Sequence, residues 1–164
     1  MNDRILSDRI SLRLHTHSDI IFMRDLYASI REDELALTNF SEAEKVAFIA
    51  QQFAAQYQHY IQNYNTDFFN IIELDNQAIG RFFVDYWPNE VRVVDIAIMP
   101  KFRNNGIGSY LFNRIFAEAT ELHKPVTIHV ERNNPAKKLY ERLGFTDKSQ
   151  TNEIYILMEW QPSG

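Results

Sequence analysis

Apolar and polar positions follow two different periods along this chain, and the shorter period marks the strands. Residues 10–14 alternate with a period of two, which is typical of a half-buried strand. Runs rich in β-branched and aromatic residues predict further strands. These runs cover residues 68–74, 78–86, 91–99, 125–130 and 153–160. Because only a short turn separates the first two runs, we expect them to form an antiparallel hairpin.

The longer period, of three to four residues, predicts a first helix soon after residue 14. Thr16 and Ser18 are candidate caps for it. Its expected apolar side consists of Ile20, Ile21, Met23, Leu26, Tyr27 and Ile30. We expect this helix to end at residues 31–35 and an acidic loop to run to Phe40.

A second, longer helix is predicted to begin at a capping box. Ser41 and Glu44 have the spacing of that motif, in which each side chain bonds the other residue's amide. The apolar face that follows consists of Val46, Ile49, Phe53, Tyr57, Tyr60 and Tyr64. A polar stripe, Gln52, Gln56 and His59, lies on one flank of that face.

Two more helices are expected in the second half of the chain. The third begins near Gly108 and ends at about Leu122. Asn134 and Pro135 open the fourth, because proline is tolerated at the first helical position. Gly144 suits its left-handed C-terminal cap. The resulting order of elements predicts a mixed α/β fold.

Composition sets limits on the function. The 164 residues are enough for one domain with a real core, and we expect a single domain over residues 1–164. The net charge of −5 argues against a nucleic-acid partner. The absence of cysteine excludes disulfides, thiol nucleophiles and cysteine-containing zinc sites. No apolar run is long enough to span a membrane and the N-terminus lacks the apolar centre of a signal peptide, so we expect a cytoplasmic protein.

The most informative stretch runs from a strand into a loop with two glycines that opens a helix. Backbone amides at a helix start have no partner within the helix, and the helix dipole favours an anion there. Gly106 and Gly108 would let a phosphate approach, and Arg103 could add charge. A Walker loop is excluded because no Gly-Lys-Ser/Thr follows. A dinucleotide fingerprint would need a third glycine where Leu111 stands.

Two motifs together resemble one known family. Arg103-x-x-Gly106-x-Gly108 after a strand resembles motif A of the GNAT superfamily of acyl-CoA-dependent N-acetyltransferases. Residues 133–145, with the sequence NNPAKKLYERLGF, resemble motif B. The order of elements over residues 10–160 fits as well, so the resemblance covers nearly the whole chain. It implies an α/β fold (α+β), the acyl-CoA N-acyltransferase fold, with a mixed, mostly antiparallel central sheet that is splayed between two strands and flanked by helices.

The resemblance also implies a binding site for acetyl-CoA as acyl donor, with no metal. Ile96 and Ile98 would offer backbone hydrogen bonds to the pantetheine arm in the gap between the splayed strands. The pyrophosphate would bind to backbone amides of Arg103, Asn104, Asn105, Gly106, Ile107, Gly108 and Ser109. Either Asn133 or Asn134 would face the cofactor, while Asn134 is also a candidate cap before Pro135.

For catalysis, the resemblance implies that Tyr140 protonates the departing thiolate of CoA, although a packing role on an apolar helix face is the alternative. The acceptor amine must lose a proton, and His129 is our candidate base because its ordinary pKa suits neutral pH. Asp95, which could instead pair with Arg92 or Arg81, Glu131 and ordered water remain alternatives. The absence of cysteine agrees with direct transfer in a ternary complex.

On the acceptor side, the resemblance points to the first two helices and their connection. The candidate contacts are Glu34, Gln52, Gln56 and His59, although solvated polar surface explains the same pattern. We therefore expect an N-acetyltransferase acting on a primary amine, either a small molecule or a peptide. The alternative is a CoA-binding regulatory or interaction module on the same fold that has lost turnover. A homodimer could form through the aromatic C-terminal strand at residues 154–158.

Overall fold

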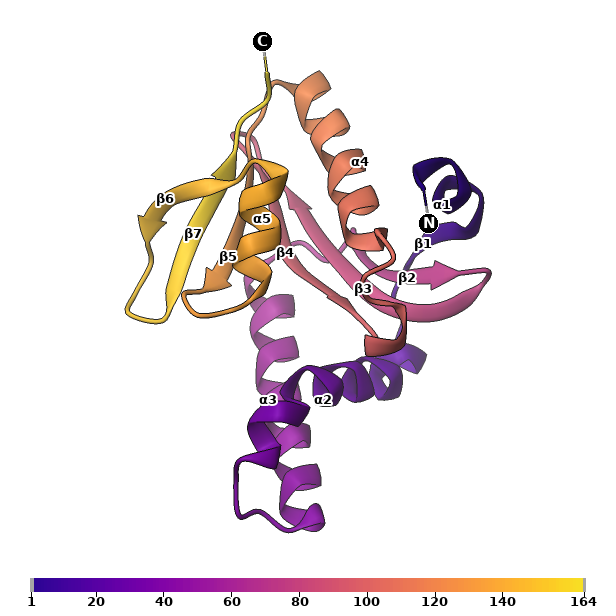
Figure 1. The fold of residues 1–164 in the computed structure, drawn as a ribbon, viewed down its shortest axis with the longest axis vertical. Coiled ribbons are helices and arrows are strands. Elements are labelled where there is room, and N and C mark those ends of the chain that lie inside the picture. Colours follow the sequence, from indigo (N-terminus) through magenta and orange to yellow (C-terminus); the bar gives the residue numbers. More distant parts are fainter. Residues whose placement is uncertain (1, 164) are drawn as a thin grey trace.

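The computed structural model describes residues 2–163, so the two ends of the predicted domain, residues 1 and 164, lie outside the described residues. Within that range the strands form one seven-stranded sheet in the order β1-β2-β3-β4-β5-β7-β6 (Figure 1). The strands are β1 (Ile10–Leu14), β2 (Phe69–Leu74), β3 (Gln77–Tyr86), β4 (Val91–Ile98), β5 (Val126–Glu131), β6 (Thr146–Gln150) and β7 (Tyr155–Trp160). All neighbours are antiparallel except β4 and β5.

Helices cover both faces of the sheet (Figure 1). The helices are α1 (Asp3–Arg9), α2 (Ile20–Ala36), α3 (Glu42–Asn63), α4 (Ile107–Leu122) and α5 (Ala136–Leu143), with short 3₁₀ turns η1 (His17–Asp19) and η2 (Pro100–Phe102). One buried cluster joins α1, α4 and α5 to the sheet, and a second joins α2 and α3 to β2 and β3. No helix in residues 2–163 is both long and apolar enough to cross a membrane.

The period-two pattern of the strands explains why the sheet has two apolar faces. Phe82 belongs to the cluster under α4, whereas its neighbour Phe83 belongs to the cluster under α2 and α3. The Phe83 ring stacks on that of Phe69, with 4.2 Å between centroids. Ile72 and Ile71 of β2 divide between the faces in the same way. The central strands are therefore buried on both sides, and this fixes their register.

The parallel contact between β4 and β5 is short. It comprises only Val91 with Val126, Arg92 with Thr127 and Val93 with Ile128, although β4 continues to Ile98 and β5 to Glu131. Beyond these pairs the two strands diverge, which is the splay that the sequence predicts. Backbone groups of β4 on the side facing β5 therefore lack a ladder partner across this gap, and unpaired backbone groups inside a protein need another partner.

Several elements differ from the sequence expectations. Helix α1 was not predicted, and the expected acidic loop at residues 32–34 belongs to α2, which ends only at Ala36. An ion pair of 3.0 Å between Arg31 and Glu34 lies along the helix surface there, and such pairs add modestly to helix stability. Thr16 has its capping box with Asp19 at η1, and Asp19 is the residue that precedes α2.

Three residues expected on buried helix faces are exposed instead: Ile21, Ile30 and Val46. The first is 65% exposed and the last 69%. The connection between α2 and α3 projects away from the sheet (Figure 1), so nothing in the described chain covers Val46 in the early turns of α3. The capping box of Ser41 and Glu44 is confirmed, as is the left-handed cap at Gly144.

Pairing of the C-terminal strand across a dimer would need a free edge on that strand, and β7 has none. Strand β7 lies between β5 and β6 in its own chain, so both of its sides are already paired. The sheet edge on that side is β6, all of whose residues are exposed. A homodimer remains a prediction, but β7 is not the strand that could form it.

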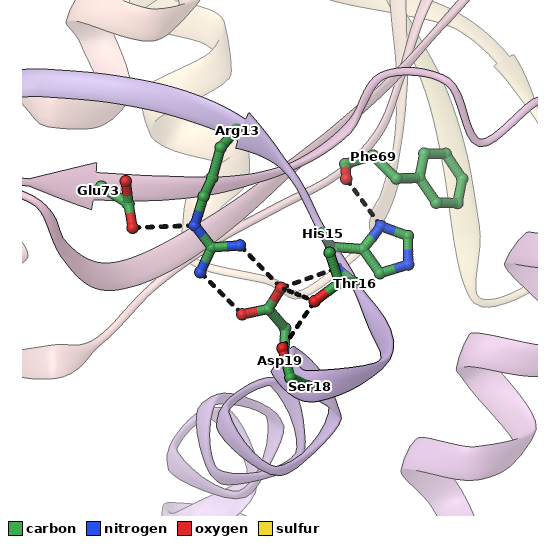
Figure 2. Close-up of polar contacts among 7 residues, drawn as sticks. All are labelled: Arg13, His15, Thr16, Ser18, Asp19, Phe69 and Glu73. Atoms are coloured by element: carbon green, nitrogen blue, oxygen red, sulfur yellow. Dashed lines mark hydrogen bonds and ion pairs between the residues drawn. The ribbon is translucent and has the colours of Figure 1, made fainter.

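Figure 2 shows a network that anchors the start of α2 to the sheet. The Arg13 guanidinium on β1 donates to both carboxylate oxygens of Asp19, at 2.9 and 2.8 Å, and to Glu73 on β2 at 2.9 Å. The Thr16 amide donates to the same Asp19 carboxylate at 2.8 Å. Beside it, Nδ1–H of His15 donates to the Phe69 carbonyl at 2.8 Å. This network fixes where α2 leaves the sheet.

We predict that Asp19→Asn weakens this anchor. The Arg13 guanidinium, helped by the Thr16 amide, lowers the pKa of Asp19 to about 2. Because this folded-state pKa lies below the unfolded value, the carboxylate stabilises the fold at neutral pH and loses its contribution as the pH falls from about 4 to about 2. Urea unfolding should show a loss of about 2 kcal/mol at pH 7 that shrinks toward pH 2.

The matched control is Asp75→Asn, because Asp75 pairs with Arg9 on exposed surface. Solvent screening makes such pairs weak, so this variant should change the free energy of unfolding little. Equal losses in both variants, or a loss in Asp19→Asn that does not depend on pH, would show that Asp19 is not an anchor of this kind.

Candidate functional site

The glycine loop between β4 and α4 has the backbone of an anion site. After β4 the chain passes through η2 and adopts left-handed conformations at Asn104 (φ 63°) and Gly106 (φ 80°). Gly106 precedes α4, and no side chain caps the helix. The Tyr110 amide makes the first bond of the helical type, to the Gly106 carbonyl at 2.9 Å. The amides of residues 107–109 are thus left to face outward.

Space is open beside Gly108 in the first turn of α4. A Cβ placed on Gly108 would meet no atom within 4 Å apart from its chain neighbours and the helix backbone, although Ile107 next to it is buried. An oxyanion could approach the amides directly at this point. The residues present therefore fit a pyrophosphate-bearing ligand.

Polar side chains of the loop hold its shape. Arg103 donates from Nε to the Ile98 carbonyl at 2.9 Å, which ties the loop back to the end of β4. Asn105 donates from Nδ2 to the carbonyls of Phe102 and Arg103, at 3.2 Å each. Arg103 is therefore engaged with the backbone in this arrangement, while its side chain stays exposed near the site.

The residues predicted to bind along β4 border the gap. Ile96 and Ile98 lie beyond Val93, the last residue of β4 that pairs with β5, and both are half-buried. Their side chains pack against the cluster under α4 and α5.

Tyr140 is buried on α5, only 7% exposed. Its ring packs edge-to-face against Phe112, with 5.6 Å between centroids, and lies 5.9 Å from the ring of Phe145. Among residues 2–163 its hydroxyl has no hydrogen-bond partner. Burial, and secondarily the charge of Asp95, raise the pKa of Tyr140 above its ordinary value. The hydroxyl therefore keeps its proton at neutral pH and is free to donate it.

Asp95 and Gln56 are both engaged by one buried arginine. Arg81, 1% exposed on β3, donates to Asp95 at 2.6 Å and to the Gln56 side-chain oxygen at 2.5 Å. Its guanidinium also lies 5.8 Å from the Tyr60 ring centroid and 5.1 Å from that of Phe83. The pairing of Asp95 with Arg81, one of two alternatives from the sequence, is confirmed, and this carboxylate is already neutralised.

His129 lies on β5 between two polar partners. Arg92 donates to its Nδ1 at 3.3 Å, so the neutral ring must carry its proton on Nε2, which lies 3.0 Å from the Thr151 hydroxyl. Burial and the charge of Arg92 lower the pKa of His129. The ring is thus neutral at pH 7, but its one lone pair points at an arginine.

Arg92 is held firmly in turn. Its guanidinium lies 4.5 Å from the Trp87 ring centroid and donates to Thr127 at 2.8 Å and to Glu90 at 3.3 Å. Trp87 itself stacks on Tyr64 of α3. Thr151 could not be recognised from the sequence as a partner of His129, because the two residues lie 22 positions apart and meet only through the sheet.

The other predicted site residues are not brought together. Glu34 is paired with Arg31 on α2 rather than standing in a loop. His59 on α3 is exposed and bonds Asn63, while Gln52 is half-buried on the same helix. The Asn134 side chain accepts from the Ala136 amide at 2.9 Å, but α5 begins at Ala136, so Pro135 precedes the helix and is not its first residue as predicted. Exposed Asn133 remains the candidate that could face a ligand.

Within residues 2–163, no group of three or more His, Asp or Glu side chains lies close enough together to hold a metal ion. One contact that sequence interpretation missed is the cross-strand pair of Glu131 on β5 and Tyr155 on β7. Each residue could be recognised from the sequence, but their pairing depends on sheet order.

Known proteins share this architecture. PaiA N-acetyltransferase from Thermoplasma acidophilum, solved with coenzyme A, aligns over 93% of this chain and 98% of its own with a TM-score of 0.66 and 17% identity. Arabidopsis thaliana Naa50, solved with the bisubstrate analogue CoA-Ac-MVNAL, aligns over 92% and 97% with a TM-score of 0.57 and 15% identity. At such identities these matches show the fold alone.

A curated relative matches part of the chain. Mouse Cysteine-rich protein 2-binding protein is 30% identical over 78 residues, which are 48% of this chain and 10% of the relative. The chain thus matches about a tenth of that protein's length. Residues 27–145 match the family described as Acetyltransferase (GNAT) family. Motif, fold and family match agree: the chain belongs to the GNAT acetyltransferase family.

Proposed function

We propose that the protein is an N-acetyltransferase that moves the acetyl group of acetyl-CoA directly to a primary amine while both are bound. The observation that carries this proposal is the gap between β4 and β5, with the uncapped start of α4 beyond the end of β4 and the buried Tyr140 hydroxyl near Asp95. The absence of cysteine supports direct transfer, because no acyl-cysteine can form.

Residues around the gap would hold the donor. Backbone groups of Ile96 and Ile98 would pair with the amides of the pantetheine arm, since both residues lie beyond the last pair with β5. Amides of residues 103–109 would bind the pyrophosphate, supported by the open space beside Gly108. Asn133, which no described residue engages, would face the cofactor.

Tyr140 would act as the general acid. Transfer forms a bond between the acceptor nitrogen and the acetyl carbon and breaks the bond from that carbon to sulfur. The departing sulfur needs a proton, and the Tyr140 hydroxyl, protonated at neutral pH and without a partner in residues 2–163, can supply it. When bound, acetyl-CoA supplies the activated acetyl group.

The acceptor amine must lose a proton, and we propose His129 as the base. Its low pKa keeps it neutral, which a base requires. Because Arg92 holds its lone pair, this role requires the ring to leave Arg92 when the acceptor enters. Gln52 and His59 remain proposed acceptor contacts. Glu34 and Gln56 would use only the oxygen lone pairs that Arg31 and Arg81 leave free.

We predict that Gly108→Asp abolishes tight CoA binding without harming the fold. The new side chain has room, and a carboxylate in the first turn of a helix is favourable. The same charge repels a pyrophosphate from the amides. Calorimetry should show the Kd for CoA raised at least about tenfold, with the melting temperature unchanged or higher.

Ala43→Asp is the matched control, because Ala43 is the second residue of α3 as Gly108 is of α4. It adds the same charge at an equivalent helix position and should leave CoA affinity unchanged. Wild-type affinity in Gly108→Asp would rule out the start of α4 as the pyrophosphate site.

We predict that Tyr140→Phe slows turnover while CoA still binds. The ring contacts with Phe112 and Phe145 are preserved, and only the proton donor is lost. We expect kcat to fall about a hundredfold, in the range typical of a lost general acid, with CoA affinity nearly unchanged. Tyr86→Phe removes a hydroxyl that bonds Glu118 instead and should leave kcat unchanged. An undiminished kcat in Tyr140→Phe removes Tyr140 from the mechanism.

Activity itself can be measured cleanly because the chain has no cysteine. A thiol reagent therefore detects only the CoA released from acetyl-CoA. We expect release that depends on a primary amine, in a panel of alkylamines, diamines, amino acids and peptides. Tight CoA binding without release from any amine would instead support the alternative, a CoA-binding module without turnover.

A further inference from the structure

Glu131 occupies the open end of the gap. It is the last residue of β5, three positions beyond Ile128, where pairing with β4 ends. It is half-buried and stands directly opposite Tyr155 of β7. Because alternate residues of a strand share a face, Glu131 projects from the same face of β5 as His129.

The ionisable groups along the gap differ in whether another charged side chain engages them. Asp95 on β4 is neutralised by Arg81, and the lone pair of His129 is held by Arg92. Glu131, by contrast, makes no ion pair with a lysine, arginine or histidine of residues 2–163. Its carboxylate is therefore the acidic group beside the gap that retains an uncompensated charge, and a half-buried charge without a partner is costly.

Glu131 stands beside an aromatic residue, Tyr155, its cross-strand partner on β7. Burial, then the charge of Glu131, raise the pKa of Tyr155, which agrees with this pairing. Arg31 does not neutralise Glu131, because its guanidinium pairs with Glu34 at 3.0 Å and lies 5.3 Å from the Tyr27 ring centroid.

From this geometry we infer that Glu131 binds the protonated amine of a cationic acceptor. Tyr155, directly opposite Glu131 on β7, stands beside the bound ammonium group. Carboxylates and aromatic faces both attract ammonium groups, most strongly where water is excluded. The inference rests on the proposed function and specifies its acceptor class: a primary amine that carries a second positive charge, rather than one with its own carboxylate.

The location also suits the proposed chemistry. His129 lies two residues before Glu131 on the same face, so when Glu131 holds one ammonium group of the acceptor, its second amine can reach the proposed base. Asp95 lies across the gap on β4 and influences both Tyr140 and Tyr60 electrostatically. An acceptor at Glu131 therefore stands on the α2 and α3 side of the same gap whose other side holds Tyr140.

Two amines of equal chain length test the inference. With acetyl-CoA, 1,6-diaminohexane should be acetylated with a kcat/KM at least about tenfold above that of 6-aminohexanoate. Glu131→Gln keeps the shape of the side chain and removes its charge. It should raise KM for the diamine about tenfold, reduce the preference between the two amines to near unity, and leave CoA affinity unchanged.

Glu121→Gln is the matched control. It makes the same change in charge on exposed α4, where Glu121 has no ion pair within residues 2–163, and it should behave as wild type. Unchanged KM and preference in Glu131→Gln overturn the inference while the proposed function stands. So does a wild-type enzyme that prefers 6-aminohexanoate or other carboxylate-bearing amines. If no amine of any kind is acetylated, the proposed function fails and the inference fails with it.

Discussion

The parallel contact between β4 and β5 ends after three residue pairs, and the candidate site depends on that short contact. Had pairing continued to Ile98, the backbone of β4 would be satisfied by β5 and no ligand could enter. Instead, the middle of a seven-stranded sheet contains backbone groups that need an outside partner. A chain of amides such as pantetheine can provide the missing hydrogen bonds, so the opening in the sheet and the family's acyl donor correspond to each other.

On the α3 side of the gap, two buried arginines engage the ionisable side chains that border it. Arg81 and Arg92 are both almost fully buried, and each is held by aromatic rings and hydrogen bonds. Arg81 engages Asp95, and Arg92 engages His129. Of the carboxylates Asp95 and Glu131 beside the gap, only Glu131 lacks an ion pair among residues 2–163. In the proposed function the two arginines therefore leave one anionic position for an incoming cation.

Local patterns in the sequence were enough for the strands with an apolar face, the capping box at Ser41, the glycine loop and the helix that carries Tyr140. They missed β6, because all of its residues are exposed and it has no apolar alternation. They failed where the outcome depended on distant partners. The acidic run at residues 32–34 resembles a loop, yet it is helical, and Arg31 pairs with Glu34 along its surface. The engagement of His129 by Arg92 depends on the register between β4 and β5, which no local pattern encodes. The family resemblance indicates the acyl donor, whereas the class of acceptor is inferred from contacts in the folded chain.

The most direct test of this account is amide hydrogen exchange with and without saturating acetyl-CoA. The account predicts slower exchange in residues 94–98 and 103–109, where backbone groups border the gap and the start of α4, and no change in β2, which is paired on both sides. Unchanged exchange in those two segments, or protection confined to other parts of the chain, would contradict the claim that the gap between β4 and β5 is the donor site.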